Sequence, residues 1–379
     1  MPVHDPSPVE LTQALVRIDT VNPPGNEHRI GSLLADLLAD TGWEAKVIET
    51  RPSRACVVAW LPSRDDPHDT ALPLCFTGHL DVVPLGTAAW SHDPFGGEVE
   101  HGRLYGRGSS DMKSGVAAMI CAARQVARLE RRRSGVLVVL TAGEESGCDG
   151  ARDLVQQGLL PRQVGALVVG EPTNLYPVIG HKGALWARIT CHGTAAHGST
   201  PELGKNAIEH MLPILQALPG ICLGPTHALQ GAPTINLGVV RGGSIPNQVP
   251  DRCEAELDIR TVAGCDHDEI VGRLQELVGS RGSVERLLDA KPVTTREDDR
   301  WVQRVFELGE AFIGERPHAR AVTYFTDAAV LGPALGLPPT VICGPGDPAL
   351  AHQTDEYAAT AAIDKAALLY LEIARDWLV

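Results

Sequence analysis

The sequence predicts an α/β protein with a mixed, largely parallel sheet flanked by helices, interrupted by a smaller inserted α+β sandwich module. Three observations carry this prediction. Short apolar runs typical of strands alternate with segments of helical apolar spacing. Several of these runs end in side chains that bind metals. After Glu171-Pro172 the pattern changes to one typical of an antiparallel sheet, and from about Pro292 the alternation of helix and strand returns.

The first part of the chain supplies most of the predicted parallel sheet. Residues 9–40 have apolar side chains at helical spacing, with a break at Asn22-Pro-Pro-Gly25. After Asp111 a second helix is expected, with Val116, Met119 and Ile120 on its apolar face. Strands are expected at residues 45–48, 55–60, 72–78, 135–143 and 166–170. Strands and helices at this spacing indicate crossover connections between parallel strands.

The middle of the chain predicts the inserted module. Residues 184–190 alternate apolar and polar side chains, as in a strand with one buried face. A helix is expected at 206–218, strands at 234–240 and 253–260, and a helix at 268–278. Beyond it, a helix at 301–312, a strand at 340–343 and a helix at 359–378 return to the first pattern. The simplest account is one α/β domain interrupted by an insertion.

Composition and charge exclude several classes of partner. The 379 residues predict two domains, and the net charge of −14 argues against nucleic acid and anionic membranes. No secretory signal is expected from the first residues, and no apolar run approaches the roughly 20 residues of a membrane span. Nine cysteines without C-x-x-C spacing predict reduced thiols and a cytoplasmic protein.

The ends of three predicted strands carry candidate metal ligands. Glu144-Glu145 end the run that begins at Gly135, His79 follows the strand at 72–78, and Glu171 follows the strand at 166–170. Ligands of open α/β sheets bind outside the carboxyl ends of the strands, so these side chains should converge. Buried carboxylates are costly unless a cation or a reacting proton compensates them.

The full set of candidate ligands suits two metal ions. Histidine and carboxylate ligands suit zinc and also tolerate cobalt or manganese. Five ligands suffice for two ions if one carboxylate bridges them, and Asp111 is the best bridge because it lies in a Gly-Ser loop. The set comprises His79, Asp111, Glu145, Glu171 and His352.

Two further carboxylates have expected roles beside the metals. Asp81, two residues beyond His79 on the same face of an extended segment, could accept a hydrogen bond from the second imidazole nitrogen. Successive side chains of an extended segment point opposite ways, so one residue of the Glu144-Glu145 pair should bind metal and the other act as general base. Competing motifs are absent, with no G-x-S-x-G and no H-E-x-x-H, and Gly344–Ala349 is interpreted as a turn.

Several motifs resemble a known family in their order along nearly the whole chain. The motifs are GHLDVVP at 78–84, LYGRGSSDMK at 104–113, GEESG at 143–147, GEP at 170–172 and AHQTDE at 351–356. With these motifs the sequence resembles the acetylornithine deacetylase / succinyl-diaminopimelate desuccinylase family, which also includes aminoacylases and carboxypeptidase G-like enzymes.

This resemblance implies a catalytic domain at 1–179 and 291–379 and an inserted lid at 180–290 that also forms a homodimer. It implies that one zinc is bound by His79, Asp111 and Glu171, the other by Asp111, Glu145 and His352, and that Glu144 is the base. His197 would reach the partner subunit's site and steady the oxyanion. Arg260, Asn247 and, as a weaker match, Lys182 would hold the substrate.

The expected function is hydrolysis of the amide bond of an N-acyl amino acid that carries a free carboxylate. The resemblance leaves the acyl group open, and the aromatic pair Tyr324-Phe325 departs from the family's usual turn. One alternative is a metallo-carboxypeptidase or dipeptidase on the same two-metal site. A third interpretation is a binding protein that has kept the fold without catalysis, against which the presence of Glu144 argues.

Overall fold

The computed structural model describes residues 5–65 and 71–379, and the chain divides into two compact units. Among the described residues, unit 1 comprises 5–65, 71–180, 294–320 and 326–379, and unit 2 comprises 181–293 and 321–325. The sequence placed the boundaries at 179/180 and 290/291; the division also assigns the segment 321–325 to unit 2. The short strands β8 (Gly180–His181) and β13 (Val293–Thr294) lie where the chain leaves and re-enters unit 1.

Unit 1 is built on a six-stranded mixed sheet in the order β1-β2-β6-β3-β7-β14. Strands β6, β3, β7 and β14 run parallel, and β2 is antiparallel to both of its neighbours. All residues of the four parallel strands are buried, as expected for strands covered on both faces. The strands are β1 (Glu44–Arg51), β2 (Arg54–Leu61), β3 (Leu74–His79), β6 (Val136–Thr141), β7 (Ala166–Val169) and β14 (Thr340–Ile342).

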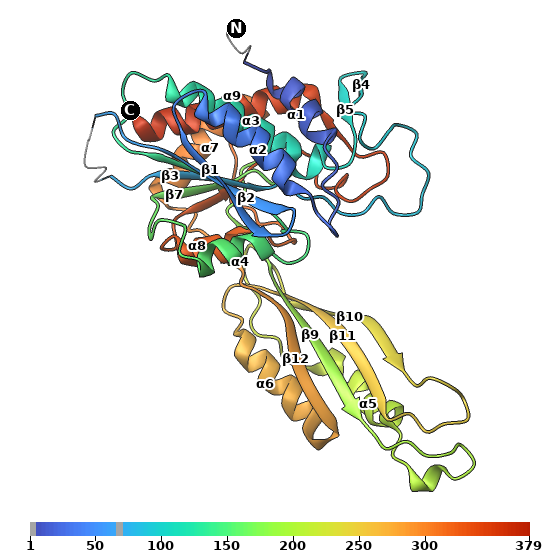
Figure 1. Ribbon diagram of the computed structural model, residues 1–379. Helices are drawn as coiled ribbons and strands as arrows, with labels where there is room; N and C mark the ends of the chain where they lie inside the picture. Colours follow the sequence, from blue (N-terminus) through green and yellow to red (C-terminus); the bar gives the residue numbers. More distant parts are fainter. Residues whose placement is uncertain (1–4, 66–70) are drawn as a thin grey trace. The chain divides into compact units, whose positions relative to one another are not determined.

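Helices cover both faces of this sheet, which confirms the predicted fold class (Figure 1). Helices α1, α2, α3 and α9 lie on one face, α7 packs on α9, and α4 and α8 pack together on the other face. The first of them starts with a capping box, in which Ser7 and Glu10 satisfy each other's backbone N–H groups. The helices are α1 (Pro8–Val16), α2 (Glu27–Ala39), α3 (Ser114–Ala127), α4 (Asp149–Gln156), α7 (Arg300–Ile313), α8 (Ala328–Ala334) and α9 (Thr360–Leu378).

A small antiparallel sheet and a π-type turn complete unit 1. Strands β4 (Val99–Glu100), β5 (Arg103–Tyr105) and β15 (Tyr357–Ala359) form the order β15-β5-β4. The turn η1 (Ser109–Lys113) follows β5 and leads into α3, with Asp111 at φ −120°, ψ 98° inside it. The pairing of β5 with β15 places Tyr105 opposite Tyr357 and so brings the neighbouring loops together. The sequence predicted only a loop at 104–111.

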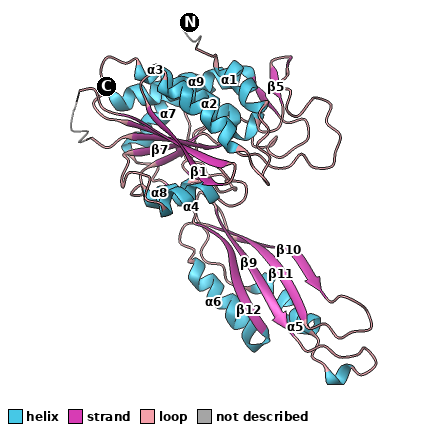
Figure 2. Cartoon of the chain, in the orientation of Figure 1, coloured by secondary structure: helices cyan, strands magenta, loops and turns pink. Residues whose placement is uncertain are grey.

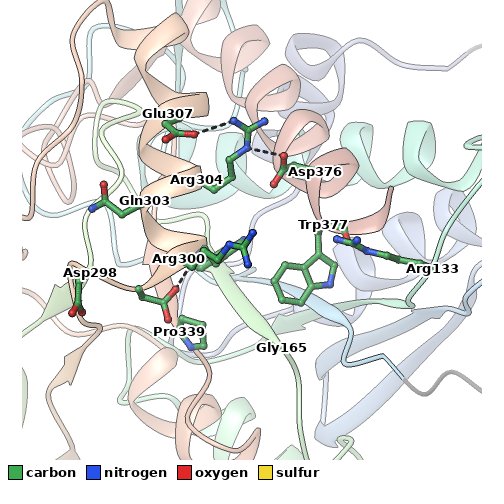
Figure 3. Close-up of a pocket in the computed structure, with 12 residues that line it drawn as sticks. Arg133, Gly165, Asp298, Arg300, Gln303, Arg304, Glu307, Pro339, Asp376 and Trp377 are labelled. Carbon is green, nitrogen blue, oxygen red and sulfur yellow. Dashed lines mark hydrogen bonds and ion pairs between the residues drawn. The ribbon is translucent and has the colours of Figure 1, made fainter.

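A pocket of about 1020 Å³ opens at the amino-terminal ends of the parallel strands (Figure 3). Gly165 and Pro339, which line it, come immediately before β7 and β14. Its other walls are charged or aromatic side chains from the helices α7 and α9 and from the segments before α7 and β6, among them Arg133, Asp298, Arg300, Trp301, Arg304, Glu307, Asp376 and Trp377.

Unit 2 is a four-stranded antiparallel sheet with two helices on one face (Figure 2). The sheet order is β10-β11-β9-β12, and α5 and α6 share a core with the buried side chains of β9 and β11. The final strand, β12, was not predicted from the sequence. The elements are β9 (Gly183–His192), α5 (Ala207–Ala217), β10 (Thr234–Gly242), β11 (Arg252–Thr261), α6 (His267–Val278) and β12 (Gly282–Ala290), with 3₁₀ turns η2 (Pro201–Leu203), η3 (Leu218–Gly220) and η4 (Gly279–Arg281).

Candidate metal centre

The carboxyl ends of three neighbouring parallel strands meet at one edge of the unit 1 sheet. Strand β3 lies between β6 and β7 and ends at His79. Glu144 and Glu145 come shortly after β6, and Glu171 shortly after β7. Because the strands are parallel and in register, their following side chains reach the same place.

The first group of possible metal ligands is His79, Asp111 and Glu171, whose ligand atoms lie within 4.8 Å of one another. The Nε2 atom of His79 is 3.1 Å from Asp111 Oδ1 and 3.8 Å from Glu171 Oε1. All three side chains are largely shielded from solvent, with exposed fractions of 1%, 13% and 6%. This group combines two strand ends with the η1 turn.

The second group is Asp111, Glu145 and His352, again within 4.8 Å. The Nε2 atom of His352 is 3.1 Å from Glu145 Oε1 and 3.5 Å from Asp111 Oδ2. Asp111 therefore belongs to both groups, and its two carboxylate oxygens face different histidines. That arrangement is the one a carboxylate bridging two ions requires.

Burial and the repulsion between neighbouring carboxylates change the pKa values of the residues in this cluster. Burial, together with neighbouring carboxylates, raises the pKa of Glu144 and Glu171 well above the usual range of a glutamate. Burial also raises the pKa of Glu145. Hydrogen bonds to Asp111 and Glu145 raise the pKa of His352 to about 10. The cluster holds more buried negative charge than its histidines neutralise when all carboxylates are ionised.

Asp111 differs from the glutamates in the direction of its shift. Burial alone would raise the pKa of its carboxyl, but hydrogen bonds from His352 and His79 outweigh burial and lower it. Burial likewise disfavours a charged His79, yet the Glu171 carboxylate and Asp111 raise the pKa of that imidazole well above its usual value. The lowered pKa of Asp111 and the raised pKa of His79 both indicate that the place where the two ligand groups meet favours positive charge.

The donor atoms fit divalent metal ions. Both groups offer imidazole nitrogen and carboxylate oxygen, and neither contains a cysteine. Such ligands suit zinc, cobalt or manganese. All nine cysteines are free thiols in the described structure and lie elsewhere. A pair of divalent ions would also supply the positive charge that the buried carboxylates lack.

Asp81 acts differently from the expectation. The sequence suggested that its carboxylate orients His79, but His79 Nδ1 lies 2.9 Å from the backbone oxygen of Asp81 and 3.7 Å from its carboxylate Oδ1. Because a carbonyl can only accept, Nδ1 carries the proton and Nε2 is free to bind a metal. The expectation is corrected in this detail, because the nearer acceptor is the main chain.

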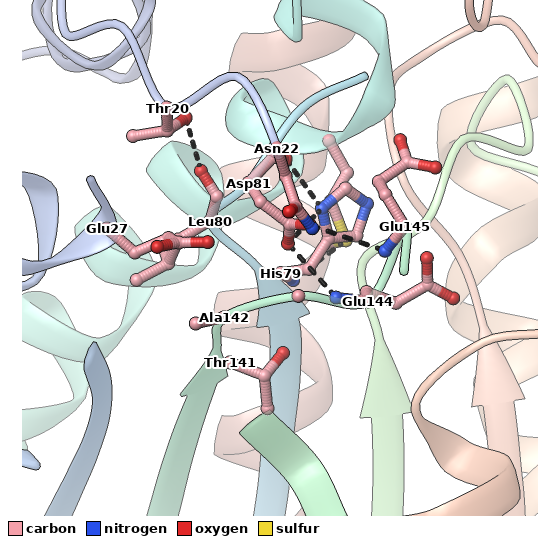
Figure 4. Close-up of polar contacts among 12 residues, drawn as sticks. Thr20, Asn22, Glu27, His79, Leu80, Asp81, Thr141, Ala142, Glu144 and Glu145 are labelled. Atoms are coloured by element: carbon pink, nitrogen blue, oxygen red, sulfur yellow. Dashed lines mark hydrogen bonds and ion pairs between the residues drawn. The ribbon is translucent and has the colours of Figure 1, made fainter. Parts of the chain in front are cut away.

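The Asp81 carboxylate instead positions the glutamate pair (Figure 4). Its Oδ1 accepts a hydrogen bond from the backbone N–H of Glu144 at 3.1 Å, and its Oδ2 accepts one from Glu145 at 3.3 Å. The side-chain amide of Asn22 donates to Oδ2 at 2.9 Å. Asn22, interpreted from the sequence only as part of a helix break, thus belongs to the support of the site.

Glu144 combines burial with a free carboxylate. Its exposed fraction is 6%, and it belongs to neither metal-ligand group. Within residues 5–65 and 71–379, no hydrogen bond or ion pair engages its side chain. Glu145 is the member of the pair that faces His352. Glu145 therefore faces a histidine of the second group, whereas the carboxylate of Glu144 has no such partner.

In unit 2 the structure brings His197 and Asn247 together. His197 forms a bridge with Gln248, and the N–H of Gly198 donates to the backbone oxygen of Asn247 at 2.8 Å. The backbone N–H of Ser199 donates to His197 Nδ1 at 3.1 Å, so the neutral ring carries its proton on Nε2. Both His197 and Asn247 are exposed.

Arg260 and Lys182, also in unit 2, are engaged within that unit. The guanidinium of Arg260 pairs with Asp258 at 3.0 Å and lies 5.7 Å from the ring centroid of Phe325. The ammonium of Lys182 donates to the backbone oxygen of Ala232 at 2.7 Å. A substrate carboxylate would have to compete with Asp258 for Arg260, and with that carbonyl for Lys182.

An α/β unit with two carboxylate-histidine groups at one sheet edge fits the class of metal-dependent hydrolases. The profile of Peptidase family M20/M25/M40 matches residues 75–376, and the chain belongs to this family. The enzymes of this family are metal-dependent.

Named relatives cover nearly the whole chain. A probable succinyl-diaminopimelate desuccinylase of Staphylococcus aureus is 28% identical over 93% of this chain and 94% of its own length. An acetylornithine deacetylase of Vibrio cholerae is 29% identical over 95% of both chains. The crystal structure of an M20 family metallo-carboxypeptidase from Sulfolobus solfataricus has a TM-score of 0.80 at 18% identity, covering 98% of this chain and 99% of its own. The likeness to this last structure confirms the fold.

No helix among the described residues is both long and apolar enough to span a membrane.

Proposed function

We propose that this protein hydrolyses the amide bond of N-acyl amino acids that carry a free carboxylate. The observation that carries the proposal is the arrangement of Asp111, whose two oxygens face His79 and His352, next to the buried and unpaired carboxylate of Glu144. The desuccinylase and deacetylase names of the relatives support an N-acyl amino acid as substrate.

The two ligand groups fit two zinc ions, with cobalt or manganese as substitutes. His79, Asp111 and Glu171 would hold one ion, and Asp111, Glu145 and His352 the other. Bound there, the ions would supply Lewis acidity, which polarises the scissile carbonyl and makes water easier to deprotonate.

Glu144 is the proposed general base. It would take a proton from the attacking water and return it to the leaving amine. Asp81 holds the backbone N–H of Glu144, so the base has a fixed main-chain position. Burial raises the pKa of Glu144, which brings it nearer to the pH at which a group can both accept and release a proton.

Unit 2 would supply binding and oxyanion stabilisation. His197 has a protonated Nε2 with no partner among the described residues, so this N–H is available to an oxyanion. We propose that it acts on the site of a second subunit. Asn247 and Arg260 would hold the substrate, and Lys182 would assist. Arg260 would bind the substrate carboxylate in a bidentate contact after its ion pair with Asp258 is broken.

The proposed homodimer forms through unit 2. Strand β10 lies at the edge of its sheet and, within residues 5–65 and 71–379, pairs only with β11. The exposed fractions of Leu237 and Val240 on it are 41% and 48%. An exposed edge strand with apolar side chains favours pairing with a second copy. Light scattering should give twice the chain mass, and Val240→Lys should give a monomer.

A substrate panel tests the proposed reaction. Purified protein loaded with zinc should hold two ions per chain and should turn over N-acetylornithine, N-succinyl-diaminopimelate or another N-acyl amino acid. Removal of the ions by a chelator should abolish turnover, and added zinc should restore it. Absence of turnover on the whole panel with two ions bound would exclude the proposed activity.

A metallo-carboxypeptidase or dipeptidase is the second candidate. The fold match to the metallo-carboxypeptidase over 98% of this chain favours including it. Dipeptides and N-acyl amino acids in the same panel distinguish the two, because a peptidase should prefer substrates with an amino acid in place of the acyl group.

A further inference from the structure

A buried ion pair lies beneath the two loops that carry Asp111 and His352. The Nη1 atom of Arg107 is 2.7 Å from Oε2 of Glu356. The exposed fractions of Arg107 and Glu356 are 1% and 0%. Neither residue belongs to a metal-ligand group, and the proposed reaction uses neither. Such a pair is costly to bury unless additional hydrogen bonds satisfy both partners.

Glu356 anchors the main chain that presents Asp111. Its Oε1 accepts hydrogen bonds from the backbone N–H groups of Ser110 at 2.8 Å and Asp111 at 3.0 Å. Its Oε2 accepts one from the N–H of Gly108 at 3.0 Å, in addition to the bond from Arg107. One carboxylate therefore accepts hydrogen bonds from three backbone N–H groups of the same loop and from a guanidinium. These bonds fix the backbone of Asp111, which belongs to both ligand groups.

Arg107 anchors the loop that presents His352. Its guanidinium donates to the backbone oxygens of Gln353 at 3.2 Å and His352 at 3.4 Å. It also donates to the backbone oxygen of Pro84 at 3.3 Å, in the segment after β3. Two segments distant in sequence, at Pro84 and at His352-Gln353, are thus tied to the planar guanidinium of a third segment, which offers a fixed fork of donors.

The two histidine ligands differ in how they are held. His79 ends a buried strand, and its Nδ1 donates to the backbone oxygen of Asp81. His352 lies in a loop with φ +64° and a side-chain exposure of 52%. Within the described residues, its Nδ1 has no hydrogen-bond partner. The position of His352 therefore depends on its main chain, and Arg107 holds that main chain.

We propose that Arg107 and Glu356 form a positioning pair that fixes the separation of Asp111 and His352. The pair would thereby determine the affinity for metal of the second position, formed by Asp111, Glu145 and His352. The inference rests on the metal centre of the proposed function. The first position relies on the strand ends at His79 and Glu171, so it should depend less on this pair. Partners of this kind behind metal ligands typically affect metal affinity by about 10–100-fold.

Zinc titration of the full-length protein tests this inference. Metal-free wild type and Glu356→Gln are titrated with Zn²⁺ against a chromophoric chelator, which yields a dissociation constant for each of two ions. The wild type should bind two ions. In Glu356→Gln the weaker constant should rise about 10–100-fold, while the tighter one changes by less than about threefold. His352→Ala identifies which constant belongs to the second position.

Two further variants keep the test decisive if Glu356→Gln folds poorly. Arg107→Lys retains a positive charge but cannot reach Glu356 and the two loop carbonyls together, so it should weaken the second position and leave the first. Glu356→Asp, which keeps the charge, should recover part of the affinity lost in Glu356→Gln. The matched control is Asp289→Asn, which removes a carboxylate bonded to the buried His267 in unit 2 at 2.7 Å and should leave both constants unchanged.

Each outcome has one meaning. Unchanged constants in both Glu356→Gln and Arg107→Lys, or equal weakening of both positions, would overturn the positioning role. A wild type that binds fewer than two ions would instead overturn the metal centre of the proposed function, and the inference with it.

Discussion

The two ends of the parallel strands in unit 1 hold charged side chains in opposite ways. At the amino-terminal ends, Arg304 lies in an open pocket and pairs with Asp376 at 2.7 Å and Glu307 at 3.0 Å, with exposed fractions between 31% and 47% (Figure 3). At the carboxyl ends, Glu144 and Glu171 are buried, and the pKa of each is raised by burial. The amino-terminal charges pair with each other in solvent, whereas the carboxylates at the other end are buried beside further carboxylates, which disfavours their ionisation.

This contrast shows that cavity volume does not locate the candidate metal centre, because the pocket of about 1020 Å³ contains none of its residues. In the pocket of about 1020 Å³, Arg304 is paired with Glu307 and Asp376, and ion pairs at the surface contribute little to stability. The carboxyl-end cluster is marked by uncompensated buried charge, which a protein retains where it serves binding or catalysis.

The largest effect should follow removal of the base. Glu144→Ala should lower kcat by about 10²–10⁴-fold because the water proton loses its acceptor, while metal content stays at the wild-type value. Steady-state kinetics together with metal analysis measures both. Arg300→Ala in the amino-end pocket is the control and should keep wild-type turnover. Undiminished turnover of Glu144→Ala would exclude this residue as the base.

The next effect should come from His197. If its Nε2–H stabilises the oxyanion, His197→Ala should lower kcat by about 10²–10³-fold, the usual cost of losing one such donor. Metal content should not change, because His197 belongs to neither ligand group. Loss of metal in this variant would contradict a role confined to the oxyanion.

A smaller effect, on stability, should come from Asp327, which is 2% exposed and accepts a hydrogen bond from Thr141 at the end of β6. Burial raises the pKa of Asp327 to about 6. A raised folded-state pKa means that its contribution is fully present below the unfolded value near 4 and is lost as pH rises through about 6. Asp327→Asn removes that loss.

Urea unfolding of the metal-free proteins between pH 5 and pH 8 measures this effect. The free energy of unfolding of Asp327→Asn relative to wild type should increase across that range by about 1–1.5 kcal/mol, because about half of the roughly 3 kcal/mol that two pKa units represent is already lost below pH 5. An unchanged difference between the two proteins at all pH values would show that Asp327 ionises in the folded state as it does in the unfolded chain.

The smallest effect should come from the amino-end pocket itself. Arg304→Ala removes two partly exposed ion pairs, so the free energy of unfolding should change by no more than about 1 kcal/mol for each pair. Turnover should not change. A large loss of either would mean that the amino-terminal pocket contributes more than its solvated charges indicate.

The strand-end residues of the site were predictable from the sequence because their physical signal is local. An apolar run that stops at His79, Glu144 or Glu171 marks a buried strand and its carboxyl end, and parallel pairing then brings the ends together. The predicted fold class is confirmed for the same reason, since the buried strands β3, β6 and β7 lie within the apolar runs.

The loop residues required more than local pattern. Asp111 and His352 lie in turns whose positions depend on Arg107 and Glu356, and the sequence gives no local signal for that contact across 249 positions. Glu356 was visible only as the last letter of a family motif. Likewise, the spacing of His79 and Asp81 does not tell whether the imidazole donates to the carboxylate or to the backbone oxygen of Asp81. The three-dimensional geometry decides for the backbone oxygen.

The insertion of unit 2 within unit 1 has a consequence for synthesis on the ribosome. Strand β14, His352 and helix α9, which packs on α1 and α3, all follow unit 2 along the chain. A nascent chain that has just emerged through residue 293 already contains nearly all of unit 2, but lacks the sheet-edge strand β14 and one candidate metal ligand, His352. The inserted unit can fold first, and the candidate metal centre can be completed only after His352 has left the exit tunnel.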